Sequence, residues 1–320
     1  MSQSLGLKKI KNKCPVCKNK KHKKLYSVDT HVSRFDLLRC GSCGLTRISP
    51  FPDDEFLEKH GITDYYGKDV NKFIPVLQKI RSLLMSRRAK YYLSYVYHRG
   101  KVIRVLDVGC GEGRLLNSFC DLGCECWGIE HRAFPVRRFI NDKQIKYRKG
   151  NPEQLSFYGK FNIIFMWHSL EHMDDPSQIF KKINDLLAPG GAVILAVPNF
   201  LCLEAGIFRK HWFHLDIPWH KYHFSKESLY YLAEENNLKI IKQSTFCMEQ
   251  GPYGIIQSLL NKSGLPKNDL YEMLKGNKRF KFSVQFIIAA VAILPASIFS
   301  FLLSLNGNGS VIKMILRKDE

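Results

Sequence analysis

Three glycines at alternate positions follow a short apolar run near the middle of the chain. The run is Val105-Leu106-Asp107-Val108, the glycines are Gly109, Gly111 and Gly113, and a segment of helical character begins at Arg114. A buried strand, a glycine turn and a helix N-terminus together present backbone N–H groups to a small anionic group. Glycine is needed there because a Cβ would collide with a ligand lying against the backbone. The G-x-G-x-G spacing lacks the additional residue of the dinucleotide fingerprint, so it predicts a ligand other than a pyrophosphate.

An acidic residue, Glu130, ends the next apolar run and lies seventeen residues after Gly113. At the end of a strand beside a glycine turn, a carboxylate can accept hydrogen bonds from both hydroxyls of a ribose. The glycine turn and the acid together therefore favour a nucleoside ligand. An ordinary strand-turn-helix without a ligand is the alternative.

These residues resemble motif I and the following strand of class I S-adenosylmethionine-dependent methyltransferases, and the resemblance extends over roughly residues 100–245. It implies that the glycine turn holds the methionine end of the cofactor and that Glu130 holds the ribose. Asn151 stands where the family usually presents an Asp to the adenine amino group, and its carbonyl oxygen can accept the same hydrogen bond. The cofactor-binding residues implied are Asp107, Gly109, Cys110, Gly111, Gly113, Glu130, Asn151 and Trp167.

Four cysteines near the N-terminus form two C-x2-C pairs with twenty-two residues between them: Cys14, Cys17, Cys40 and Cys43. Each pair predicts a tight turn that directs two thiolates to one point, and four thiolates complete a closed tetrahedral zinc site. The intervening segment, residues 24–39, reads as a β-hairpin, so we expect a small zinc ribbon with a structural Zn²⁺. A redox-active C-x-x-C is the alternative, and two matched pairs favour one metal over it.

Histidines and aromatic residues are concentrated in residues 208–224, directly after a predicted strand. This composition is typical of a substrate pocket, and the segment resembles one in a methyltransferase branch associated with glycan and isoprenoid-linked substrates. Methyl transfer to a hydroxyl needs alignment and a base with a pKa near neutral, for which imidazole is suited. The candidate bases are His220, His223 and His172, the last in a Glu-His pair similar to the family's EH motif. For each of these histidines, a purely positional role is the alternative. A metal site built from these histidines is disfavoured, because the segment lacks an ordered ligand spacing.

Alternating strand and helix patterns would position these residues. The βα alternation predicts an α/β, doubly wound, Rossmann-like parallel sheet with ligands at the carboxyl ends of its strands, and the resemblance implies seven strands with the last antiparallel. An N-terminal helix is expected over residues 73–98, with Leu84, Tyr91 and Tyr95 on its apolar face. Strands are expected at residues 105–108, 125–130, 145–148, 161–167, 192–197, 238–242 and 310–317, and helices at 114–119, 135–141 and 176–187.

An uncharged apolar segment, Val284 to Leu305, lies between the sixth and seventh predicted strands. At about 1.5 Å per residue it is long enough to cross a bilayer as a helix. A single crossing would separate the seventh strand from the sheet that it must join. We therefore expect a re-entrant hairpin centred on Pro295 or a helix lying along the membrane interface, flanked by lysines and arginines suited to anionic headgroups. A buried helical hairpin or a dimer surface is the alternative.

The formal net charge is +20, and residues 1–50 carry twelve Lys and Arg against two Asp, or +10. Such a basic segment predicts a polyanionic neighbour, either nucleic acid or an anionic membrane surface. Ten cysteines without a secretory signal predict a reducing compartment. The expected domains are residues 1–50 as the zinc ribbon, 51–100 as linker and N-terminal helix, 101–249 as cofactor-binding core, 250–309 as membrane-associating insert and 310–320 as the last core strand.

Together these features predict an S-adenosylmethionine-dependent methyltransferase acting on a hydroxyl of a lipid-linked saccharide or isoprenoid intermediate. The enzyme would be peripheral or monotopic on the cytoplasmic face of the membrane, with that surface and the lipid-linked acceptor as its partners and no nucleic acid favoured. An RNA methyltransferase is the alternative suggested by the basic N-terminus, although residues 168–171 lack the Asn/Asp-Pro-Pro-aromatic signature for base amines. A non-catalytic membrane-bound scaffold that retains the cofactor fold is the third hypothesis.

Overall fold

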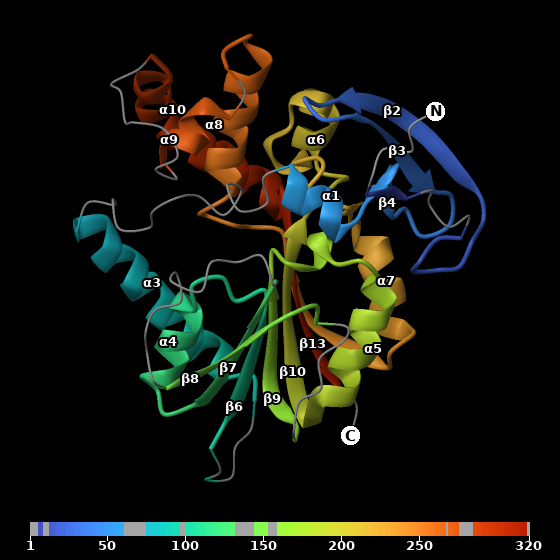
Figure 1. Cartoon of the computed structure of the whole chain (residues 1–320). Coiled ribbons are helices and arrows are strands. Elements are labelled where there is room, and N and C mark those ends of the chain that lie inside the picture. Colours follow the sequence, from blue (N-terminus) through green and yellow to red (C-terminus); the bar gives the residue numbers. More distant parts are fainter. Residues whose placement is uncertain are drawn as a thin grey trace. The chain divides into compact units, whose positions relative to one another are not determined.

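The computed structural model describes residues 6–8, 13–60, 75–96, 100, 102–131, 144–152, 159–266, 268–274 and 284–318. The helix expected at residues 135–141 lies outside them. The chain divides into two compact units, each built from separated segments. Unit 1 comprises Met1–Val70, Val197–Tyr231 and Ser244–Lys313, and unit 2 comprises Asn71–Ala196, Leu232–Gln243 and Met314–Glu320. Figure 1 labels the elements of both.

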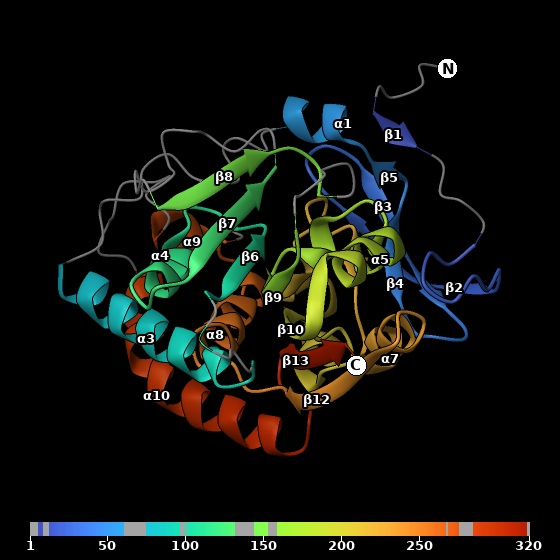
Figure 2. The ribbon, with the colours of Figure 1, turned by 90° about the horizontal axis from the view of Figure 1, so that it is seen from below.

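A seven-stranded sheet forms the centre of unit 2, in the order β12-β13-β10-β9-β6-β7-β8, which can be followed across Figure 2. The pairings from β10 through β9, β6 and β7 to β8 are parallel, and the last strands are antiparallel. The predicted seven-stranded mixed sheet is therefore confirmed. Its strands are β6 (Arg104–Val108), β7 (Glu125–Glu130), β8 (Ile145–Lys149), β9 (Phe161–Trp167), β10 (Leu187–Pro198), β12 (Leu238–Ser244) and β13 (Val311–Lys318).

The strand order reverses between β6 and β9, so chain connections leave the sheet in opposite directions at this point. The carboxyl ends of these two strands are the place where an open α/β sheet leaves a crevice for ligands. The helices of unit 2 begin and end close to the predicted positions: α4 (Arg114–Cys120) follows β6, and α5 (Pro176–Leu186) follows β9. Asp175 caps α5 by accepting hydrogen bonds from the N–H groups of Ser177 and Gln178.

Helix α3 (Pro75–Leu93) is confirmed as a helix, but its buried face differs in part from the predicted one. Ala89 and Tyr92 of the helix are buried in the core of unit 2, and the predicted Tyr95 packs against that core just beyond the helix, whereas the predicted Tyr91 is 43% exposed. Tyrosines occur on several sides of this helix, so apolar spacing alone did not identify the face that packs on the sheet.

Unit 1 contains a four-stranded antiparallel sheet in the order β11-β4-β3-β2. The predicted hairpin is present as β2 (His22–Asp29) and β3 (Arg34–Cys40), and β4 (Thr46–Ser49) pairs with β3. The fourth strand, β11 (Tyr222–His223), comes from the histidine-rich segment and pairs with β4 through Tyr222↔Arg47 and His223↔Thr46. A second pair, β1 (Leu7–Lys8) with β5 (Phe51–Pro52), lies in the same unit.

The remaining helices of unit 1 include one that corrects a prediction. Helix α10 (Val284–Leu305) continues through Pro295 without interruption, so the expected re-entrant hairpin is wrong. It is also mostly exposed, which excludes the buried helical hairpin. The other helices that begin in unit 1 are α1 (Asp54–Lys59), α6 (Leu203–Phe208), α7 (Lys226–Glu234), which continues into unit 2, α8 (Gly251–Lys262) and α9 (Asp269–Leu274).

Candidate functional site

The glycine turn between β6 and α4 has the backbone conformation that its sequence predicts. Gly109, Gly111 and Gly113 have φ angles of 82°, 54° and 77°, in the left-handed region that favours glycine. The N–H groups of Gly109 and Cys110 both donate to the carbonyl of Ile129 on β7, at 2.9 and 3.1 Å. These bonds fix the turn at the carboxyl ends of the two central strands.

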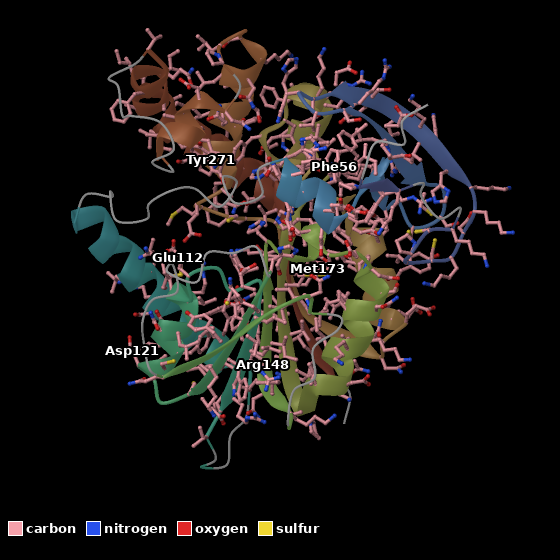
Figure 3. All side chains as sticks on the ribbon, viewed as in Figure 1. Phe56, Glu112, Asp121, Arg148, Met173 and Tyr271 are labelled. Carbon is pink, nitrogen blue, oxygen red and sulfur yellow. The ribbon has the colours of Figure 1, made fainter. Side chains whose placement is uncertain are left out.

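The three glycines are required for different reasons. A Cβ on Gly109 would overlap the side chain of Ser169, and a Cβ on Gly113 would overlap the hydroxyl of Tyr147. A Cβ on Gly111 would meet no atom of the described residues within 4 Å, its two chain neighbours apart. Gly111 therefore borders open space, while the other two allow close packing behind the turn. Figure 3 labels Glu112, which lies between Gly111 and Gly113.

Glu130 lies at the end of β7 with its carboxylate directed into the glycine turn. Its Oε2 accepts the N–H of Gly111 at 2.6 Å, and its Oε1 accepts the N–H of His131 at 2.8 Å. Burial raises the pKa of this carboxyl, and the two backbone hydrogen bonds act in the opposite direction. The turn and the acid singled out in the sequence are thus in direct contact.

Asp107, on β6, is a second buried carboxyl at this edge of the sheet. Burial, and then the charge of Glu130, raise the pKa of Asp107 to about 7. Its Oδ1 is buried and has no hydrogen-bond partner within the part of the chain that the structure describes. A buried acceptor without a partner is costly, and a donor on a ligand would relieve that cost.

The other implied cofactor residues belong to the same edge of the sheet. Cys110 is buried in the turn, and burial raises the pKa of its thiol. Asn151 is half-buried just beyond β8, and Trp167 is the half-buried last residue of β9. The guanidinium carbon of Arg88 lies 4.4 Å from the centre of the Trp167 ring. The eight implied residues thus come from, or directly follow, the carboxyl ends of four neighbouring strands.

Sequence reasoning missed two residues that support the turn. The hydroxyl of Ser169 donates to the carbonyl of Val108 at 2.6 Å, and the hydroxyl of Tyr147 donates to the carbonyl of Glu112 at 3.1 Å. Each ties a neighbouring segment to the glycine turn. The sequence carries no signal for them, because a serine and a tyrosine are common near strand ends and their roles depend on tertiary contacts.

Two of the three predicted bases, His220 and His223, lie together in unit 1. Both are buried, and their ring centres are 6.3 Å apart. The Nδ1 of His220 lies 2.8 Å from the carbonyl oxygen of His214, and its Nε2 lies 3.9 Å from a carboxylate oxygen of Asp216. His172, the third candidate, ends a short 3-10 turn of unit 2, Leu170–His172.

The four cysteines converge in unit 1. The sulfur atoms of Cys14 and Cys43 are 3.6 Å apart, those of Cys17 and Cys40 are 3.4 Å apart, and all four lie within 4.8 Å of one another. These separations are too long for disulfides, in which the sulfurs are about 2.05 Å apart. The arrangement is a four-thiol cluster capable of holding one metal ion.

The two C-x2-C turns have matching backbone hydrogen bonds. The N–H of Lys18 donates to the carbonyl of Cys14, and the N–H of Gly44 donates to the carbonyl of Cys40. Lys18 and Gly44 both have a positive φ, of 59° and 73°. Each pair therefore ends in the same left-handed turn, for which glycine at position 44 is well suited.

Comparisons with known proteins agree with this geometry. Over 104 residues the chain is 33% identical to the ubiquinone biosynthesis O-methyltransferase of Pelagibacter ubique, covering 31% of this chain and 43% of that protein. The same-named protein of Pseudomonas aeruginosa is 29% identical over 103 residues, covering 30% of this chain and 44% of that one. The matched region thus spans less than half the length of these curated relatives.

Two solved structures are similar at low sequence identity. A putative sarcosine dimethylglycine methyltransferase from Galdieria sulphuraria has a TM-score of 0.49 at 13% identity, covering 83% of this chain and 99% of that one. The magnesium protoporphyrin IX methyltransferase of Synechocystis has a TM-score of 0.44 at 16% identity, covering 60% of this chain and 91% of that one.

A family model described as a methyltransferase domain matches residues 77–243. That span is more than half of the chain and contains the glycine turn, Glu130, Asn151 and Trp167. The chain therefore belongs to the methyltransferase domain family.

Proposed function

We propose that the chain is an S-adenosylmethionine-dependent methyltransferase whose acceptor is a hydroxyl of a lipid-linked saccharide or isoprenoid intermediate. The observation that supports the methyltransferase activity is the contact between Glu130 and the turn at Gly111. Beside it lies the Oδ1 of Asp107, which has no hydrogen-bond partner among the described residues. Two buried carboxyls beside an open glycine position fit a ligand that carries several hydroxyl and amino donors.

The residues present fit S-adenosylmethionine. Glu130 would accept the ribose hydroxyls, and Asp107 would accept a donor from the methionine end. Asn151 and Trp167 would contact the adenine side. When bound, this cofactor supplies an electrophilic methyl group on sulfur. The chain's own part is to align the acceptor and take up its proton.

His220 is the preferred base for that proton. A carbonyl oxygen only accepts hydrogen bonds, so the contact with His214 requires that Nδ1 carry a hydrogen. In the neutral imidazole this makes Nε2 the basic nitrogen. His223 and His172 follow as candidates. The O-methyltransferase names of the curated relatives support oxygen as the atom methylated.

The cysteine cluster is proposed to hold a structural Zn²⁺ in a zinc ribbon. Four sulfurs placed tetrahedrally at about 2.3 Å from zinc would lie about 3.8 Å apart, close to the separations found. Arg47 is buried next to the cluster and donates to the carbonyl of Lys13. Its positive charge would offset the negative charge of a tetrathiolate site. Four protein ligands leave no position for a substrate, so the metal is structural.

A lipid-linked acceptor and a cytoplasmic membrane location are proposed together. Helix α10 is long and apolar enough to span a membrane by length and composition, and little of it is buried. A surface of that kind fits an enzyme whose acceptor is held in a bilayer. The cytoplasmic face is proposed because free cysteines are typical of a reducing compartment.

The test combines two measurements on the full-length protein. Isothermal titration with S-adenosylmethionine should show one site per chain, and no binding would reject the methyltransferase proposal. Mass spectrometry of membrane lipids and glycans, from cells with and without the protein, should show an acceptor heavier by one methylene when the protein is present. Methylation of soluble acceptors alone would reject the lipid-linked class.

RNA is the second candidate acceptor, favoured by one observation. Lysines 18, 20, 21, 23 and 24 are exposed on and beside β2, the edge strand of the small sheet. Such a group of cations binds phosphates without reading sequence. RNA that copurifies with the protein and dissociates steeply with salt would support this candidate over the lipid-linked one.

A further inference from the structure

Helix α10 exposes an apolar surface along its whole length. Val291 is 74% exposed and Leu294 is 68% exposed. Neither a charged side chain nor a histidine occurs among its 22 residues. Large apolar residues that are at least one-third exposed are Val284, Ile287, Ile288, Val291, Ile293, Leu294, Ile298, Phe299, Phe301, Leu302 and Leu305. A contiguous surface of this kind marks an interaction site.

The opposite side of α10 packs against α8, and we call this contact the seam. The closest approach in this seam is between two small residues, Gly251 and Ser300, where a Cβ on Gly251 would overlap Ser300. Ala296 is buried in a cluster with Ile255, Ile256 and Leu260 of α8. One side of α10 thus belongs to the core of unit 1, and the exposed apolar residues on its other side are left for a partner.

The C-terminal end of α10 is tied to the rest of unit 1. The hydroxyl of Thr245 donates to the carbonyl of Ser304 at 3.2 Å and accepts the N–H of Gly309 at 3.3 Å. The side-chain amide of Asn199 donates to the carbonyl of Gly309 at 2.8 Å. The chain then enters β13 at Val311. The helix therefore cannot leave α8 and cross a bilayer without breaking both the seam and these bonds.

The hydroxyl groups of α10 are satisfied in the way that a lipid environment requires. Ser297 and Ser304 donate to the carbonyls of Ile293 and Phe301, both at 2.6 Å. These two hydroxyls return their hydrogen bonds to the helix itself and need no water. A protein–protein interface usually has a polar rim that bonds to the partner, and these two serines have no free hydrogen-bond donor for one.

The charges next to α10 in the sequence also favour a lipid surface. Four cations, Lys275, Lys278, Arg279 and Lys281, directly precede the helix in the sequence. The cations that follow it lie on β13, where Arg317 donates to the carbonyl of Tyr95 and Lys318 donates to that of Asn184. No acidic residue lies between Glu272 and Asp319. Cations that directly precede an apolar helix complement anionic headgroups at a membrane surface.

We propose that α10 is a monotopic anchor that lies in the plane of a bilayer, with its Val291–Leu294 side among the acyl chains and its Ala296 side on α8. The membrane is the partner, and the helix does not span it. This inference deepens the proposed function and depends on it for the lipid-linked acceptor.

Flotation with vesicles of phosphatidylcholine and phosphatidylglycerol tests the surface. The full-length chain should float, and the double variant Val291→Glu/Leu294→Glu should lose more than about tenfold in partitioning, because it replaces two aliphatic side chains of the membrane-facing side with charged ones. The matched control is Val102→Glu/Met248→Glu, at exposed apolar positions outside α10, and it should float like the parent. Equal flotation of the α10 variant and the parent would overturn the proposal.

The depth of the helix distinguishes an in-plane anchor from a crossing. Leu294 and Leu305 lie on the same side of α10, eleven residues or about 16 Å apart along its axis. Tryptophan introduced at either position, measured against the parent protein, should be quenched best by lipids brominated close to the headgroup. Deep quenching at position 294 with shallow quenching at 305 would show a spanning helix and reject the in-plane orientation.

Two further readouts separate this inference from the proposed function. If the protein binds S-adenosylmethionine in the titration but does not bind vesicles, only the anchor proposal is contradicted. If it binds vesicles but not S-adenosylmethionine, only the methyltransferase proposal is contradicted. Sedimentation without lipid tests a second copy of the chain as the occupant. A dimer that Val291→Glu/Leu294→Glu converts to a monomer, with no vesicle binding by the parent, would assign this face to self-association.

Discussion

At the scale of single residues, Glu130 carries most of the proposed cofactor recognition. It is buried, and each of its carboxylate oxygens accepts a backbone N–H. We expect Glu130→Gln to weaken S-adenosylmethionine binding by on the order of 10- to 100-fold, because hydrogen bonds to charged groups are worth about 1.5–3 kcal/mol. Isothermal titration measures the effect. The control is Glu125→Gln on the same strand, whose carboxylate pairs with Lys146 and Arg104, and unchanged binding is expected there.

Asp107 gives the unfolding free energy a pH dependence of defined sign. Its pKa is raised from 3.8 to about 7 in the folded protein. The folded state therefore holds a proton that the unfolded state has lost between these values, and stability falls as the pH rises through this window. The fall amounts to ~4 kcal/mol for this one group.

Urea unfolding at pH 5 and pH 8 checks the expectation. The parent, measured without ligand, should be less stable at pH 8, and Asp107→Asn should lose most of the difference because its amide does not titrate. A variant that keeps the full pH dependence of the parent would show that other groups cause it.

At the scale of elements, the glycine turn depends on close packing against β8. Gly113 and Gly123 both have a positive φ, near 80°, but among the residues that the structure describes only a Cβ at position 113 would meet a neighbour, the hydroxyl of Tyr147. Gly123→Ala should cost about 1 kcal/mol for its backbone conformation alone. Gly113→Ala should cost clearly more, and it should also weaken S-adenosylmethionine binding.

A double-mutant cycle tests the cause of that excess. Removing the hydroxyl with Tyr147→Phe should recover part of the stability lost in Gly113→Ala, so the two changes should be non-additive. If the two changes in unfolding free energy are additive, the extra destabilisation of Gly113→Ala has a cause other than the Tyr147 hydroxyl.

The cysteine cluster should also stabilise the histidine-rich segment. β11 pairs with β4, and the N–H of Ile48 donates to the carbonyl of Lys221 at 3.2 Å. We expect one zinc per chain by atomic emission, lost in Cys43→Ser and retained in Cys124→Ser, whose thiol lies outside the cluster. Chelation should increase amide hydrogen exchange in β11 as well as in β2 to β4. Exchange that rises in the hairpin and stays constant in β11 would contradict this coupling.

At the scale of the whole molecule, the sequence predicted the parts whose signal is local. The strands beside the glycine turn and the cysteine pairs are short motifs with fixed spacing, and the structure has them at the expected positions. The pairing of β11 with β4 joins residues more than 170 positions apart through a two-residue strand. No local pattern encodes such a contact. Pro295 was expected to break its helix, but one missing N–H is tolerated where a neighbouring helix supports the backbone.

The proposed membrane attachment has two physical components that salt should separate. The net charge of +20 attracts anionic lipids, and this attraction is screened when the Debye length falls to about 10 Å at 0.1 M salt. Burial of the apolar side of α10 is not screened. Flotation with phosphatidylglycerol-containing vesicles should therefore decrease from low to high NaCl and level off above zero. With phosphatidylcholine alone it should be weaker, insensitive to salt and abolished by Val291→Glu/Leu294→Glu. Complete release from both kinds of vesicle at high salt would mean that charge alone attaches the protein and that α10 does not enter the bilayer.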